Sequence, residues 1–166
     1  MKTKLTLFVA VLAAVLFGAG CASVPKPDVA NAVKWKGHWY VYFSSRSTWD
    51  TAKKECEKLG GHLVIINSEE ENIFVHTLAR KHDTESVYTW FGASDRDGKA
   101  GEAKWVDGSL VSDGFSNWGD DPVKLGGDWD HGTMILRHGP NTEKMAVQSW
   151  DFGGRGQKWT YVCEWE

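Results

Sequence analysis

The sequence is poor in positive charge, in proline and in cysteine. Its 19 lysines and arginines face 22 aspartates and glutamates, a formal net charge of −3, and it holds four prolines and three cysteines. Without a basic excess the chain has no general attraction for nucleic acid or for an anionic membrane surface, and we expect neither as a partner. With 42% hydrophobic and 25% charged residues, its composition argues against a disordered chain or a membrane bundle.

Signatures of catalysis are also missing. There is no glycine-x-serine-x-glycine elbow and no phosphate-binding loop, and the six histidines show no metal-ligand spacing. Glycoside hydrolysis is not excluded, because it needs only two carboxylates that folding brings together, and the sequence does not reveal their separation. We therefore expect that the protein is not an enzyme.

The longest apolar run lies at the start of the chain. Lys2 and Lys4 precede the run Leu5 to Phe17, which is followed by small residues and then by Cys21. The run is too short to cross about 30 Å of hydrocarbon as a mature helix, so it predicts a signal peptide at residues 1–20. The small residues and the cysteine resemble the lipobox of bacterial lipoproteins, although Gly18 stands where a branched apolar residue is usual.

This resemblance implies a lipid on Cys21, which would attach the protein to a membrane of the bacterial cell envelope. Ala22 is not the aspartate that retains enteric lipoproteins in the inner membrane, which by analogy favours the outer membrane. The alternative is a plain secretory signal and a secreted protein whose Cys21 stays a thiol. Residues 21–34 hold two of the four prolines and no aromatic residue, and they predict a lipidated N-terminus followed by a flexible tether.

The predicted domain, residues 35–166, places helical periodicity before strand periodicity. After an alternating strand at 38–43, apolar residues recur at helical spacing over 47–59, with Cys56 on the buried stripe. A capping box at Ser68 and Glu71 predicts a second helix from about residue 69 to 81. From residue 87 onward, short β-like runs alternate with glycine and aspartate turns. Helices first and strands later predict an α+β fold.

Ten tryptophans supply large rigid side chains for so small a domain. Four of them lie in strand-like runs and are predicted to be core: Trp90, Trp105, Trp150 and Trp159. Two others, Trp118 and Trp129, flank an acidic and nearly aperiodic stretch, "NWGDDPVKLGGDWDHGT". These two are predicted to be either packing anchors or platforms for a ligand. A loop of this length in a compact domain is normally functional or disordered.

The order of landmarks in residues 35–166 resembles the C-type lectin-like domain. "GGHLVIINSEEENIFV" is similar to that family's stretch leading into its second helix, "WFGASD" to its core motif, and "WVDGS" and "FSNW" to the next two landmarks. In "SWDFGGRGQKWTYVCEWE" a tryptophan stands thirteen residues before a cysteine that is followed by glutamate, as at the family's C-terminal end. The resemblance implies two helices, short antiparallel β-sheets and a long irregular loop.

The resemblance also implies a disulfide bond between Cys56 and Cys163. The family's second disulfide, across the long-loop region, is absent: Arg155 stands at its downstream position and its upstream position falls near His131. Order in the loop must therefore come from packing, from hydrogen bonds or from a bound ion.

The acidic loop is a candidate calcium site, because Ca²⁺ takes six to eight oxygen ligands and the loop is rich in carboxylates. Sugar-binding members of the family pair a glutamate-proline-asparagine motif in this loop with a tryptophan-asparagine-aspartate motif on the next strand. Here "DDPV" keeps the proline but has valine for asparagine, and "WDF" has phenylalanine for aspartate. The candidate metal ligands are Asp120, Asp121, Asp128, Asp130 and Asp151, and the candidate ligand-binding residues are Trp118, Asp120, Asp121, Pro122, Trp129 and Asp151.

These features predict a lipid-anchored recognition module of the cell envelope, which binds a carbohydrate or protein ligand through its long loop. Tryptophan faces stack on sugar rings and also form hot spots in protein interfaces, so the two ligand classes remain open. The rival prediction is a structural or assembly protein of the envelope with no small-molecule site.

Overall fold

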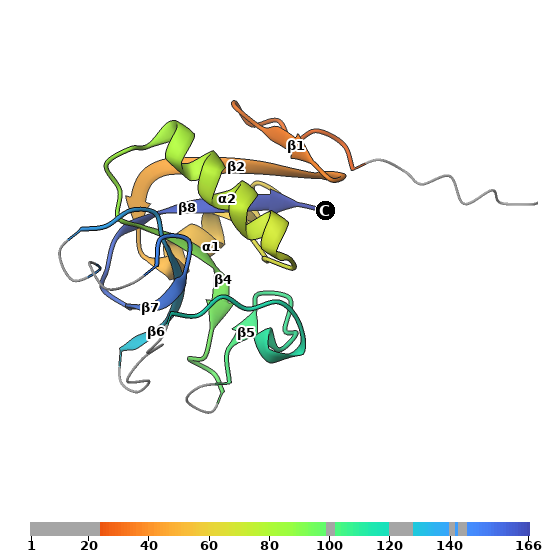
Figure 1. Cartoon of the computed structure of the whole chain (residues 1–166). Coiled ribbons are helices and arrows are strands. Elements are labelled where there is room, and N and C mark those ends of the chain that lie inside the picture. Colours follow the sequence, from red (N-terminus) through yellow and green to blue (C-terminus); the bar gives the residue numbers. More distant parts are fainter. Residues whose placement is uncertain (1–23, 99–101, 120–127, 140–141, 143–145) are drawn as a thin grey trace, which may run out of the picture.

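The computed structural model describes residues 24–98, 102–119, 128–139, 142 and 146–166. Helices and strands are both present and the strands form one mixed sheet (Figure 1), so the α+β prediction is confirmed. Cys21 and the first loop candidates, Asp120, Asp121 and Pro122, lie outside the described residues. None of the helices in the described part is long and apolar enough to cross a membrane.

The sheet brings the two ends of the domain together. Its strand order is β1 (Val33–Trp35), β2 (His38–Ser47), β8 (Trp159–Trp165), β4 (Tyr88–Ser94), β6 (Trp129–Ile135) and β7 (Trp150–Gly154). Two short strands join this path: β3 (His62–Leu63) pairs with β8 and β5 (Lys104–Trp105) pairs with β4. The strands pair antiparallel, as predicted, except β4 and β8, which are parallel at the centre of the sheet.

The first helix, α1 (Trp49–Lys58), buries the predicted face of Trp49, Ala52 and Cys56. Thr48 caps it, because the Thr48 side chain accepts a hydrogen bond from the backbone N–H of Thr51. Leu59, which continues the apolar spacing, is instead the exposed residue that ends the helix. Cys56 therefore lies inside the core.

The second helix, α2 (Glu69–His82), begins at the predicted capping box. Ser68 Oγ accepts from Glu71 N at 3.2 Å, and a Glu71 carboxylate oxygen accepts from Asn67 N at 2.8 Å. Three glutamates in the first turn and Arg80, Lys81 and His82 in the last turn match the helix dipole. In Figure 1, α2 lies across β2 and β8.

Cys56 and Cys163 meet in the core between α1 and β8. Both side chains are fully buried free thiols in this structure, so the predicted disulfide is not formed in it. Burial, and then the hydrogen bond between the two thiols, raises the pKa of Cys163. Folding thus brings the two cysteines together, and the covalent bond stays a prediction.

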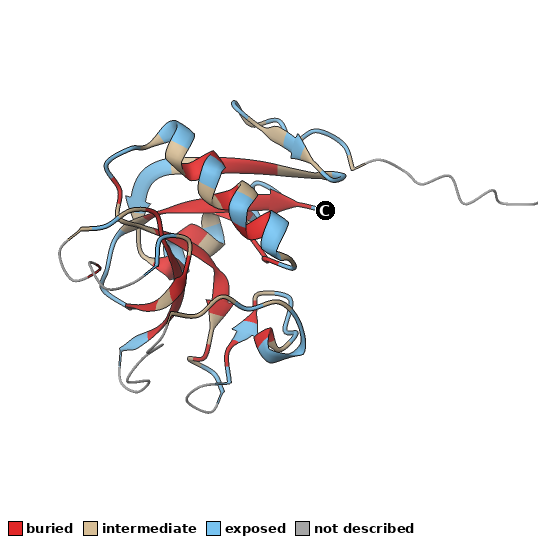
Figure 2. Ribbon diagram, in the orientation of Figure 1, coloured by how far each residue is buried: buried red, intermediate tan, exposed pale blue. Residues whose placement is uncertain are grey.

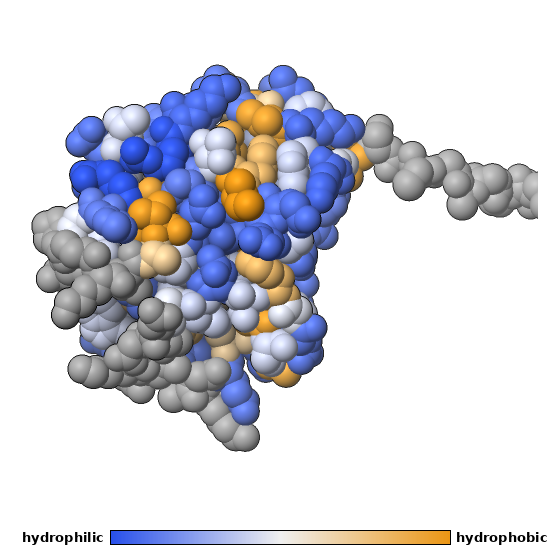
Figure 3. All heavy atoms as spheres, viewed as in Figure 1, coloured by the Kyte–Doolittle hydropathy of each residue, from blue (hydrophilic) through white to orange (hydrophobic). Residues whose placement is uncertain are grey.

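The core consists of two clusters of buried side chains that share the sheet (Figure 2). Trp90 and Trp150 are fully buried and Trp105 is nearly so, as predicted. Trp159 is only half-buried and packs against Trp90, with ring centroids 4.3 Å apart. Figure 3 shows a largely hydrophilic face on which apolar side chains form small separate groups.

The stretch predicted as a flexible tether contacts the domain in its described part. Val24 O accepts a hydrogen bond from Trp39 Nε1 at 3.1 Å, and Val29 and Ala32 pack against the core cluster around α1. Residues 33 and 34 already belong to β1. The apolar residues spaced between the prolines and charges explain this contact.

Candidate functional site

The strand β7 carries a phenylalanine, Phe152, at the position where the family's calcium motif has a carboxylate. Phe152 is buried and stacks on Trp118, with ring centroids 4.4 Å apart and ring planes 7° apart. Trp150 is fully buried, and its Nε1 donates to Asn72 Oδ1 at 2.7 Å. On this strand only Asp151, which is half-buried, offers carboxylate oxygens, and one of them accepts from Phe152 N at 2.8 Å.

Trp118 is placed as a packing anchor. One face of its ring is covered by Phe152, and its ring also meets Trp150 edge-on at 5.5 Å. Backbone hydrogen bonds fix the same segment, because Gly119 N donates to Trp150 O and Trp150 N donates to Asn117 O. The stacked face of Trp118 is therefore not available to a ligand.

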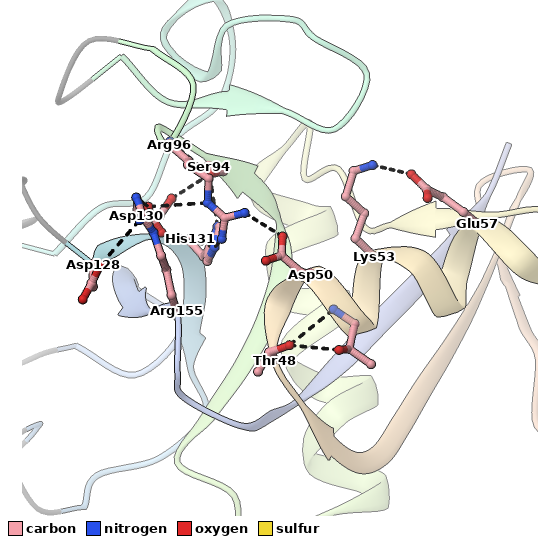
Figure 4. Close-up of polar contacts among 11 residues, drawn as sticks. Thr48, Asp50, Lys53, Glu57, Ser94, Arg96, Asp128, Asp130, His131 and Arg155 are labelled. Carbon is pink, nitrogen blue, oxygen red and sulfur yellow. Dashed lines mark hydrogen bonds and ion pairs between the residues drawn. The ribbon is translucent and has the colours of Figure 1, made fainter.

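At the start of β6, Asp130 is buried and held by two arginines (Figure 4). Arg155 Nε and Nη2 both donate to Asp130 Oδ2, at 2.7 and 2.6 Å. Arg96 Nε lies 3.6 Å from the same oxygen. Asp128, which is exposed, lies 3.5 Å from Arg155 Nη1. Two of the five predicted calcium ligands thus already have a cationic partner.

Arg155 forms an ion pair with Asp130 where the family's second disulfide would lie. Arg155 stands at the position of one cysteine of that disulfide, and Asp130 is next to the other position, at His131. The ion pair joins the start of β6 to the residue directly after β7. At the same edge, Trp129 and Gly154 are paired residues of the two strands. Charge-assisted hydrogen bonds to a buried carboxylate are strong, so this contact can order the edge of the sheet.

His131 connects this ion pair to α1. Its ring is fully buried and lies flat against Trp49, with centroids 4.4 Å apart. Arg96 Nη2 donates to His131 Nε2, while Arg96 Nη1 donates to Asp50 Oδ1 at 2.8 Å. Because Nε2 accepts, the ring proton is on Nδ1 and is donated to Ser94 Oγ at 3.1 Å. Burial lowers the pKa of His131 to about 4, so the ring is neutral near pH 7.

Trp129 is the exposed aromatic side chain at this edge. It is the first residue of β6 and is 49% exposed, whereas the other tryptophans in the described residues are buried or half-buried. Its position is fixed by pairing with Gly154 and by the neighbouring hydrogen bond from Arg155 N to Asp128 O at 2.8 Å. The indole ring thus lies at the surface over Gly154, and its chain neighbour Asp128 is paired with Arg155. We call the surface formed by Asp128, Trp129, Gly154 and Arg155 the Trp129 surface.

Comparison with known proteins decides the family. The family model for the lectin C-type domain matches residues 45–165. The chain belongs to the C-type lectin family. Human asialoglycoprotein receptor 2 is 31% identical to this C-type lectin over 134 residues, which cover 81% of this chain and 39% of the receptor. Human C-type lectin domain family 10 member A is 40% identical over 88 residues, 53% of this chain and 25% of that protein. The chain therefore matches less than half the length of these relatives.

Solved C-type lectin structures share the fold at low sequence identity. CEL-I from Cucumaria echinata has a TM-score of 0.69 and 23% identity, covering 82% of this chain and 95% of that one. The cow CD23 carbohydrate-recognition domain, solved in the presence of a GlcNAc2Man3 oligosaccharide, has a TM-score of 0.67 and 24% identity over 82% and 94%. A calcium-independent type II antifreeze protein has a TM-score of 0.67 and 22% identity over 82% and 92%. The fold thus also occurs in a protein described as calcium-independent.

The described residues do not fit the calcium ion that many C-type lectins bind. An ion at Asp130 would have to displace two guanidinium groups, and Phe152 supplies no oxygen. Asp151 remains as a carboxylate near the loop, and Asp120 and Asp121 lie outside the described residues. We therefore derive no binding step from calcium.

The sequence pattern does not predict the cationic partners in this region. Arg155 is recognisable only as the residue that replaces a cysteine, and no local pattern marks Arg96. Arg96 also lines a cavity of about 420 Å³ between α1 and β5, together with Asp50, Lys53 and Trp105. The one indication in the sequence is Arg155 itself, an arginine at a position where the family has a disulfide-forming cysteine.

Proposed function

We propose that this C-type lectin is an exported recognition module that binds a carbohydrate through the Trp129 surface without a calcium bridge. The observation that carries the proposal is the 49% exposed indole of Trp129 on a rigid strand end, flanked by Asp128 and Arg155. An aromatic face stacks on the apolar face of a sugar ring, and the charged neighbours can accept from and donate to its hydroxyl groups.

The family and the local electrostatics both support this choice of ligand. Carbohydrate recognition is named for two similar solved structures, the mouse scavenger receptor C-type lectin domain and the cow CD23 domain with its oligosaccharide. The usual ion-bridged geometry lacks support here, because Phe152 fills the strand position and Asp130 is held by Arg155. Stacking plus hydrogen bonding at the Trp129 surface remains as the physical route to a sugar.

The test is binding of the purified full-length protein to a glycan array, measured once with calcium and once with a chelator. We expect Trp129→Ala to weaken binding at least tenfold, because the stacking surface is lost, and Trp129→Phe to retain part of it. Ile73→Ala is the matched control, since Ile73 is a similarly exposed apolar residue on α2. Binding should be equal in calcium and in chelator.

Other outcomes point to the rival functions. Glycan binding that is unchanged in Trp129→Ala removes this surface from the site. Binding that requires calcium and is lost in Asp121→Asn replaces our proposal by the ion-bridged geometry. If no glycan is retained, a protein ligand or a structural role in the envelope takes its place.

We further propose that a lipid on Cys21 holds the module at a bacterial cell envelope, in the outer membrane. Support comes from the signal-peptide pattern of residues 1–20 and the lipobox-like small residues before Cys21. In a bacterial host fed labelled palmitate, the wild-type chain should incorporate the label and sediment with outer membranes. Cys21→Ser should do neither, and equal labelling of both proteins would rule out the anchor.

A further inference from the structure

Two histidines and two glutamates converge where β2, β3 and β8 meet. His38 begins β2, His62 begins β3, and Glu164 and Glu166 lie two residues apart on one face at the end of β8. In the sheet register, His62 is the partner of Glu164, and Trp39 is the partner of Trp165, which brings His38 next to Glu166. Figure 1 shows this C-terminal end of β8 beside β2, away from β6 and β7.

Their potential ligand atoms face one another at short range. His38 Nδ1 lies 2.8 Å from Glu164 Oε1, and His62 Nε2 lies 3.8 Å from Glu166 Oε1. One ligand atom each of His38, Glu164 and Glu166 lies within 4.8 Å of the other two. Ligands of one tetrahedral zinc ion, at about 2.0–2.2 Å from the metal, are separated by roughly 3.3 Å, so these three side chains would have to rotate to close the set. His62, whose Nε2 lies near Glu166, would have to rotate further to join them as a fourth ligand.

The orientation of His62 suits a metal ligand. His62 Nδ1 lies 3.0 Å from Leu63 O, and because a carbonyl only accepts, Nδ1 carries a proton and Nε2 is the nitrogen that could bind a metal. Nε2 lies 3.8 Å from Glu166 Oε1. A hydrogen bond from one imidazole nitrogen to a backbone carbonyl, which orients the other nitrogen to a metal, is the usual outer-shell arrangement of metal-bound histidine.

Glu164 is the buried carboxylate of the cluster, and it lies near a second carboxylate, that of Glu166. One of its oxygens accepts from Ile65 N at 3.0 Å, which fixes the carboxylate plane, and the other accepts from His38 Nδ1 at 2.8 Å. Buried carboxylates are costly unless a positive partner neutralises them, and in this structure the partner of Glu164 is His38, a role that a metal ion could share. His38, His62 and Glu166 are all partly open to solvent, so a cation can reach the cluster.

We propose that His38, His62, Glu164 and Glu166 form a binding site for a single transition-metal ion of the zinc class. Imidazole nitrogen together with carboxylate oxygen suits Zn²⁺ and its neighbours, whereas Ca²⁺ prefers an all-oxygen set. The ion would clamp β2, β3 and β8, and so would join the beginning and the end of the domain. The site is on another part of the sheet from the Trp129 surface and does not depend on the proposed carbohydrate binding.

The test is titration of the untagged full-length protein with Zn²⁺ by calorimetry and with Co²⁺ by visible absorption. We expect one equivalent of metal to bind, and the Co²⁺ complex to show a d–d spectrum without the near-ultraviolet band of thiolate ligation, which excludes the cysteines. His62→Asn and Glu166→Gln should each weaken Zn²⁺ binding at least tenfold. His138→Asn is the matched control, because His138 is exposed after β6 and belongs to no such cluster among the described residues.

Circular dichroism shows whether each variant is folded, and both altered side chains are partly exposed, so folding should be retained. Saturable binding that falls tenfold in both variants and is unchanged in His138→Asn supports the site. Absence of one-equivalent binding, a thiolate band, or a loss smaller than tenfold in either variant overturns it.

Discussion

At the scale of single residues, the chemistry of the sheet edge at β6 and β7, which we call the long-loop edge, depends on which cation pairs with Asp130. In the described residues that cation is the guanidinium of Arg155, supported by Arg96. A guanidinium fork satisfies a carboxylate by paired hydrogen bonds and is always charged, so the edge stays ordered without an ion in solution. His131 extends the same contacts to Trp49 on α1 as a neutral ring.

The neutral state of His131 predicts a dependence of stability on pH. Burial lowers its pKa in the folded protein to about 4, below the ordinary value of 6.5. As pH falls from 6.5 to 4 the unfolded chain therefore binds the proton first, and the free energy of unfolding should decrease, by about 3 kcal/mol. Urea denaturation of wild type and His131→Gln at pH 7, 5.5 and 4 measures this. An equal decrease in both proteins would show that other groups cause it.

At the scale of elements, local side-chain contacts set where the helices begin. Thr48 and Ser68 each stand one residue before a helix and accept a hydrogen bond from a backbone N–H in its first turn. The Ser68 cap has an additional function, because Glu71, buried in the same turn, also accepts from the Tyr40 hydroxyl at 2.6 Å. The cap therefore aligns α2 with β2.

Removal of the Ser68 cap should weaken α2. In Ser68→Ala the N–H of Glu71 loses its acceptor, and we expect the free energy of unfolding to fall by about 1 kcal/mol. The measurement is urea denaturation followed by circular dichroism. Ser112→Ala is the control, since Ser112 is exposed and outside α2 and should change stability by less than about 0.5 kcal/mol. Equal effects of the two substitutions would mean that the cap contributes nothing.

At the scale of the whole molecule, the fold is closed by contacts between its ends. β2 and β8 are neighbours in the sheet, and Cys56 on α1 meets Cys163 on β8. The same end carries the His38 and Glu166 cluster. The long-loop edge, with Trp129, lies on the other side of the sheet order, at β6 and β7. The proposed carbohydrate binding and the closure of the domain therefore involve different parts of one sheet.

The contact of Cys56 with Cys163 predicts a stabilising disulfide in an oxidising compartment. A closed loop of about a hundred residues stabilises the folded state by roughly 4 to 5 kcal/mol in the chain-entropy model. In a Cys21→Ser background, the protein made under oxidising conditions should lose about that much stability to urea on reduction. Cys56→Ala should show no effect of reductant. Two titratable thiols in the oxidised, denatured protein would contradict the bond.

Short-range periodicity, capping and the order of landmarks are enough to predict the class of fold, both helices, most of the tryptophan core and the family. The folded structure fixes what the polar side chains do. It stacks Trp118 on Phe152, leaves Trp129 exposed, and pairs Asp130 with Arg155. It also brings His38 and His62 to Glu164 and Glu166. Such partners are far apart in the chain and meet only through strand register, which no local pattern specifies.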